Sequence, residues 1–122
     1  MKSSIGYVWC LATALGVVGA QLPARAQDTA TLVGHWRKTT VSFGEPRDEN
    51  LVLRANGAAE RWIVTARSRT PVATGAWQVE GKILTVQMPG QNAASMPFTF
   101  HQGQLVYPNV PNRRGFWDRI GR

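Results

Sequence analysis

The chain has 122 residues, a formal net charge of +7 and one cysteine. This length suits a single domain with a modest core, and a lone cysteine excludes a disulfide within the chain. The basic charge is spread along the sequence rather than gathered in one block, and no nucleic-acid-binding module is present, so we expect no nucleic-acid partner.

The N-terminal segment has the pattern of an export signal. Lys2 gives a basic start, residues 5–20 form a short apolar run, and Ala24-Arg25-Ala26 matches a small-x-small cleavage site. We therefore expect residues 1–26 to be a signal peptide cleaved after Ala26. The product is expected to be periplasmic or secreted, without a stable membrane anchor and, because Cys10 lies in the leader, without a thiol.

The remainder is predicted to be a short tail, residues 27–31, followed by one domain, residues 32–122. From residue 32 onward, short runs with strand-like alternation are separated by turn signals, and no stretch has a convincing helical period. The pattern predicts an all-β domain of about eight antiparallel strands in an up-and-down barrel, without a C-terminal helix. The expected strands are 32–43, 50–55, 58–66, 74–79, 82–88, 97–101, 104–107 and 115–120.

Three tight turns are expected to fix the pairing. Asn56-Gly57 favours a two-residue type I′ turn, which would pair Leu51 with Trp62 and turn Arg61 towards solvent. The same register places Glu60 on the inner face, where we expect it to reach past the rim or to pair with an arginine.

The other two tight turns are expected at Glu80-Gly81 and Gln102-Gly103. The first would align Trp77 with Leu84. The second would bring four apolar side chains to one face: Phe98, Phe100, Leu105 and Tyr107.

Longer connections are expected at 44–49, 67–73, 89–96 and 108–114. In an up-and-down barrel alternate connections lie at opposite ends, so all four would share one end, which is the expected working face. That end would gather basic side chains: Arg47, Arg67, Arg69, Arg113 and Arg114. Glu45, Asp48 and Glu49 would lie among them.

The aromatic residues allow two interpretations. They either fill the barrel as a packed core or line a pocket for a flat or apolar molecule, with arginines at its mouth. The candidate ligand-binding residues are Trp62, Trp77, Phe98, Tyr107, Arg67, Arg69, Arg113 and Arg114.

Gly34-His35-Trp36 on the first strand and Arg119 near the end resemble the corresponding residues of small bacterial lipocalin-like, calycin-type barrels. The resemblance implies that Arg119 packs across Trp36 to close one end of the barrel, with Gly34 leaving room. It also implies an exported module that binds a small apolar or anionic ligand at the long-loop end. The chain differs from full-length lipocalins in its shorter length, its lack of disulfide cysteines and its lack of a C-terminal helix.

No catalytic or metal-binding pattern is evident. His35 and His101 are both expected on the outer face, and the mature chain lacks a cysteine nucleophile. We therefore expect neither an enzyme nor a cofactor. Two alternatives remain open: a protein-interaction module, such as a periplasmic protease-inhibitor-like barrel that presents residues 27–31, or a packed envelope accessory domain with no small ligand.

Overall fold

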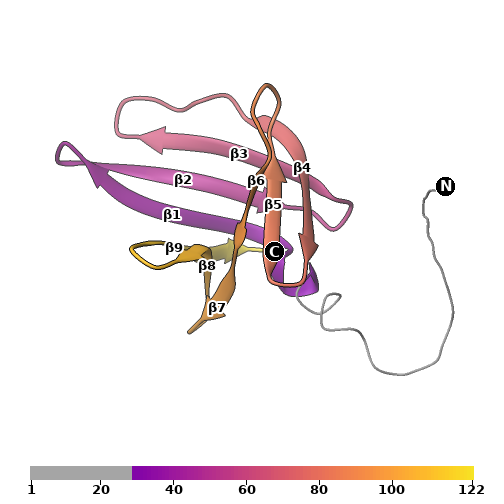
Figure 1. Cartoon of the computed structure of the whole chain (residues 1–122). Coiled ribbons are helices and arrows are strands. Elements are labelled where there is room, and N and C mark those ends of the chain that lie inside the picture. The colour runs from indigo at the N-terminus through magenta and orange to yellow at the C-terminus, as the bar shows by residue number, and fades with distance from the viewer. Residues whose placement is uncertain (1–28) are drawn as a thin grey trace, which may run out of the picture.

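The computed structural model describes residues 29–122, which form an all-β, antiparallel, up-and-down and nearly closed barrel (Figure 1). The predicted leader and residues 27 and 28 of the predicted tail lie outside the described residues. The strands in this range are β1 (Gly34–Ser42), β2 (Glu45–Leu53), β3 (Ala58–Thr65), β4 (Ala73–Glu80), β5 (Ile83–Gln87), β6 (Ala94–Pro97), β7 (Thr99–His101), β8 (Gln104–Val110) and β9 (Arg113–Gly121). Their order in the sheet is β6-β5-β4-β3-β2-β1-β9-β8-β7.

The described residues contain nine strands rather than about eight, because the strand expected at 97–101 is divided at Phe98. β6 pairs with β5, whereas β7 pairs with β8. Phe98 is buried at this break, and its N–H still donates to the carbonyl of Lys82 on the β5 side. The chain thus changes partners at Phe98, and this change brings the two ends of the sheet together.

Two of the connections expected to be long are tight hairpins. β1 and β2 are joined by Phe43 and Gly44, both with positive φ, and β8 and β9 by Pro111 and Asn112. The prediction for 44–49 was wrong because the outer halves of β1 and β2 are exposed on both faces. A strand that buries neither face needs no apolar alternation, so its sequence resembles a loop.

The register predicted between β2 and β3 was wrong by one residue. Leu51 pairs with Arg61, and Trp62 pairs with Asn50. Gly57 N–H donates to Arg54 O at 3.0 Å, and only Gly57 of the turn has positive φ, so the loop is a type I turn followed by a bulge rather than a type I′ turn.

The extra loop residue reverses the two faces of β3. Arg61 points inwards, whereas Trp62 lies outside, with its ring centroid 5.3 Å from that of His35. Glu60 is also outside, where it forms an ion pair with Arg54 at 2.9 Å rather than reaching past the rim.

The other two turns preserve the predicted faces. Trp77 pairs with Val86 rather than Leu84, a shift of two residues that leaves the same side chains inside. At Gln102-Gly103 both residues have positive φ, and Phe100 pairs with Leu105 as predicted.

The core is organised by indole rings whose N–H groups all reach backbone carbonyls. Trp36, Trp77 and Trp117 donate to the carbonyls of Leu32, Arg54 and Tyr107, each at 2.8 Å. Satisfying these buried donors inside the protein avoids the cost of leaving them unpaired. The other buried members of the cluster are Leu32, Leu51, Leu53, Ala59, Leu84, Met88, Phe98, Leu105 and Tyr107.

Arg119 packs over Trp36 at one end of the barrel. Its Cζ lies 4.3 Å from the ring centroid of Trp36, and its Nη1 donates to Val33 O at 3.0 Å. Gly34 makes this approach possible, since a Cβ there would lie 2.6 Å from Nη1 of Arg119. Residues 29–32 form a helical turn beside this cluster, so the first strand begins at Gly34 rather than at residue 32.

Loss of a tryptophan is expected to lower the unfolding free energy by different amounts on the inner and outer faces of the barrel. Trp36→Ala removes a fully buried ring and is expected to cost ~3–5 kcal/mol of unfolding free energy. Trp62→Ala removes a ring from the outer face and is expected to cost about 1 kcal/mol. Urea unfolding of both variants measures the difference, and equal costs would contradict the observed register.

Candidate functional site

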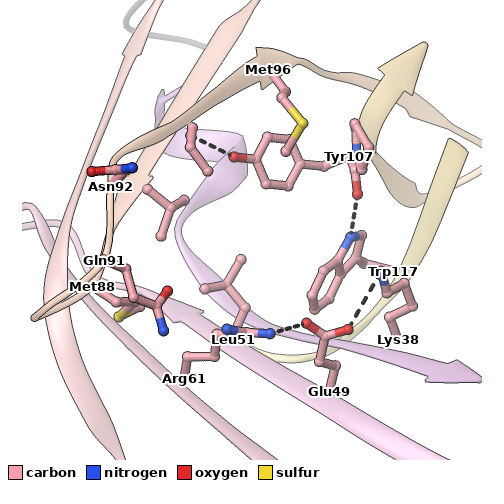
Figure 2. A pocket seen from close by; sticks show the side chains of 13 residues that line it. Lys38, Glu49, Leu51, Arg61, Met88, Gln91, Asn92, Met96, Tyr107 and Trp117 are labelled. Carbon is pink, nitrogen blue, oxygen red and sulfur yellow. Dashed lines mark hydrogen bonds and ion pairs between the residues drawn. The ribbon is translucent and has the colours of Figure 1, made fainter. Parts of the chain in front are cut away.

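The barrel contains a partly open cavity of about 230 Å³ beside the loop between β5 and β6 (Figure 2). Side chains from both sides of the barrel reach it, and the loop contributes two amides near its edge. The lining residues are Lys38, Glu49, Leu51, Arg61, Val86, Met88, Gln91, Asn92, Ala94, Met96, Tyr107, Pro108 and Trp117.

Part of the cavity lining is apolar. Val86 belongs to β5, Met88 follows the end of β5, Met96 comes from β6, and Trp117 from β9. Methionine side chains are unbranched and polarizable, so Met88 and Met96 can adjust to the outline of an apolar guest. These side chains suit a flat or aliphatic molecular body.

Three charged side chains also line the cavity. Lys38 and Glu49 are directly paired across β1 and β2, and Arg61 follows from β3. Glu49 binds both cations: its Oε1 lies 3.5 Å from Lys38 Nζ, and its Oε2 lies 2.6 Å from Arg61 Nη2. Lys38 Nζ also lies 5.0 Å from the ring centroid of Trp117. These three residues are called the charged triad below, and Figure 2 shows them converging on one side of the cavity.

The triad keeps Glu49 ionised. Burial by itself would raise the pKa of this carboxyl group, but the hydrogen bond from Arg61 and the charges of Lys38 and Arg61 outweigh burial and lower the pKa. With the carboxylate ionised, the triad has one positive charge in excess. The cavity therefore favours a guest with a negative charge or a strong hydrogen-bond acceptor.

Tyr107 forms part of the wall where β8 approaches β6. Its hydroxyl lies 3.2 Å from Leu84 O and 3.0 Å from Ala94 O, and it donates to these carbonyls. Burial raises the pKa of Tyr107 to about 12, so the hydroxyl remains protonated at neutral pH. The phenol thus fastens β8 to β5 and to the start of β6.

The predicted ligand-binding aromatics are dispersed by the observed fold. Tyr107 lines the cavity, whereas Trp77 and Phe98 are buried in the core and are absent from its lining. Trp62 lies on the outer face, because the register of β3 differs from the predicted one.

The four predicted arginines do not line the cavity either. Arg67 lies 3.9 Å from Glu45 on the surface, and Arg69 Cζ lies 5.7 Å from the ring centroid of Trp62. Arg113 reaches the sulfur of Met96 at 3.6 Å, and Arg114 donates to Asn109 Oδ1 at 3.1 Å. Arg113 thus touches a cavity residue from outside rather than facing the interior.

The charged triad was not predicted as a site. Arg61 was placed on the wrong face, and Glu49 was assigned to a loop. Lys38 carried a usable signal, because strand alternation from the buried Trp36 places it on the inner face. Within residues 29–122, no group of three or more His, Cys, Asp or Glu side chains is arranged to hold a metal ion.

Comparison with known proteins assigns no family: no protein-family model matches the chain, and no curated protein matches its sequence. Over residues 29–122 no helix has the length and apolar character needed to cross a membrane.

The triad predicts a specific dependence of stability on pH. A lowered carboxyl pKa adds stability that is complete above the unfolded pKa and is lost as the pH falls through the folded value. We expect the unfolding free energy of the wild type to fall more steeply than that of Glu49→Gln below about pH 5. Urea unfolding at a series of pH values measures both slopes.

Glu60→Gln is the matched control, because Glu60 belongs to an ion pair on the outer face. It is expected to keep the steep wild-type slope. A wild-type slope in Glu49→Gln would show that Glu49 does not contribute through its ionised form.

Proposed function

We propose that this protein is an exported, non-enzymatic, lipocalin-like module that binds a small molecule with an apolar body and a single acidic group. The cavity of about 230 Å³ is the observation that carries the proposal, since apolar side chains and two cationic ones line it together. This chemistry agrees with what the resemblance of Gly34, Trp36 and Arg119 implies. Export rests on the sequence of residues 1–26.

The shape of the cavity favours a ligand over a completely packed core. An eight- or nine-stranded barrel has room for side chains or for one small ligand, and here the inward side chains leave space beside the loop between β5 and β6. The bound molecule would place its apolar body against Met88, Met96 and Trp117.

The charge of the triad selects the head group. The carboxylate of Glu49 pairs with Nη2 of Arg61 and with Nζ of Lys38. Both cations carry further N–H donors. A carboxylate or sulfonate beside the triad would complete their hydrogen bonding and balance the excess positive charge. A neutral molecule of the same shape would lack this interaction.

The inhibitor-like alternative is less well supported. Residues 29–31, the part of the expected tail that the structure describes, form with Leu32 a helical turn rather than an extended arm. Leu32 is buried, and Arg119 donates to the carbonyl of Thr31. These contacts hold that part of the tail against the barrel.

Calorimetric titration with 2-naphthoate tests the proposed ligand chemistry, since this probe joins a flat apolar body to one carboxylate. We expect 2-naphthoate to bind at least about tenfold more tightly than the neutral 2-naphthalenemethanol, the size expected for one charge-assisted hydrogen bond. Arg61→Gln is expected to remove this preference. Arg69→Gln, an outer-face arginine variant, is expected to retain it.

Equal binding of the acid and the alcohol would contradict the role of the triad. An equal loss of the preference for 2-naphthoate in Arg69→Gln and Arg61→Gln would contradict the cavity as the binding site. Native mass spectrometry of the exported protein then identifies the natural ligand by its mass.

A further inference from the structure

The β1–β2 hairpin extends beyond the barrel as a projecting arm (Figure 1). β1 pairs with β9 only as far as Arg37, so its outer half pairs with β2 alone. β3 accompanies β2 only from Arg47 inwards. The tip of the arm, residues 41–46, is therefore a two-stranded ribbon with no further strand beside it.

An aromatic side chain occupies the apex of this tip. Phe43 is fully exposed, and Val41, which is paired with Pro46, is 72% exposed. Phe43 also has φ 52°, a region that bulky side chains rarely adopt and that Asn or Gly tolerates better. The ring thus lies outside the core, at a position where its backbone conformation is unfavourable.

Two arginines lie near the apex, Arg47 and Arg67. A surface hollow beside Phe43 includes Arg47 and Thr65, and Arg67 follows on the next turn with 85% of its side chain exposed. Of the nearby carboxylates, Glu45 lies 3.9 Å from Arg67 and Asp48 accepts a hydrogen bond from Thr39.

The end of the barrel that carries the arm is rich in arginine. Because the connections alternate, the arm shares its end with the turn after β3 and with the β8–β9 hairpin. This end carries five arginines, Arg47, Arg67, Arg69, Arg113 and Arg114, against the carboxylates Glu45 and Asp48. The opposite end carries Arg54, Lys82, Arg119 and Arg122 against Glu60 and Glu80.

From this arrangement we propose that the arm docks this end of the barrel onto a lipid bilayer with anionic head groups. The ring of Phe43 enters the interfacial layer, and the nearby arginines contact lipid phosphates. A bilayer fits better than a protein partner because the apolar apex is convex and projecting, which suits insertion into a surface that deforms around it. This proposal does not depend on the ligand proposed for the cavity.

Sedimentation with lipid vesicles tests the proposal, using protein expressed from the full sequence and with its N-terminus determined by mass spectrometry. The vesicles are phosphatidylcholine alone, or phosphatidylcholine with about 30% phosphatidylglycerol. We expect binding to the anionic vesicles, weaker binding to the neutral ones, and loss of the difference at about 0.5 M salt.

Phe43→Asn separates folding from binding, because Asn suits positive φ but lacks the apolar ring. Its thermal midpoint is expected to equal or exceed that of the wild type, while its binding to anionic vesicles falls about tenfold. Ile83→Asn is the matched control: this exposed residue lies beside the turn at the opposite end and is expected to bind as the wild type does.

The proposal would be overturned by unchanged vesicle binding in Phe43→Asn, by an equal loss of vesicle binding in Ile83→Asn, or by equal binding to neutral and anionic vesicles. Absence of binding to anionic vesicles would also overturn it, and a Phe43-dependent protein partner would then favour protein docking.

Discussion

The short turn between β2 and β3 decides which side chains enter the barrel. Because the loop contains one residue more than a type I′ turn, with Gly57 as the bulge, Leu51 pairs with Arg61. This register brings Arg61 to Glu49 and moves Trp62 outside. The entry of Arg61, which gives the cavity its excess positive charge and hence the proposed preference for an acidic ligand, depends on this feature of the backbone.

Closure of the barrel depends on side chains as well as on strand pairing. β6 and β8 lie close together but are not paired with each other. β6 pairs through its backbone with β5, and β8 pairs with β7 and β9. Tyr107 on β8 connects the two strands through its hydroxyl, which donates to the carbonyl of Ala94 on β6. Phe98 marks the point where the chain changes pairing partners. The cavity lies against the join of β6 and β8, where space remains between less regularly paired strands.

Much of the fold was predictable from local patterns, whereas the site was not. Alternation predicted the inner faces of β4 and β5. The tight turn expected at Gln102-Gly103, where both residues have positive φ, gave the correct pairing of β7 with β8. The turn at Asn56-Gly57 allowed two geometries that differ by one residue, and the sequence favoured the wrong one. Residues 44–49 resembled a loop because an exposed strand has no buried face to reveal it. Both errors fell on the residues of the triad.

Cross-strand nuclear Overhauser effects between β2 and β3 would establish the register that places Arg61 in the cavity. We expect backbone contacts of Leu51 with Arg61 and of Asn50 with Trp62. Contacts of Leu51 with Trp62 would instead show a two-residue turn, with Trp62 inside and Arg61 in solvent. That result would remove Arg61, and with it the excess positive charge, from the cavity and contradict the proposed ligand chemistry.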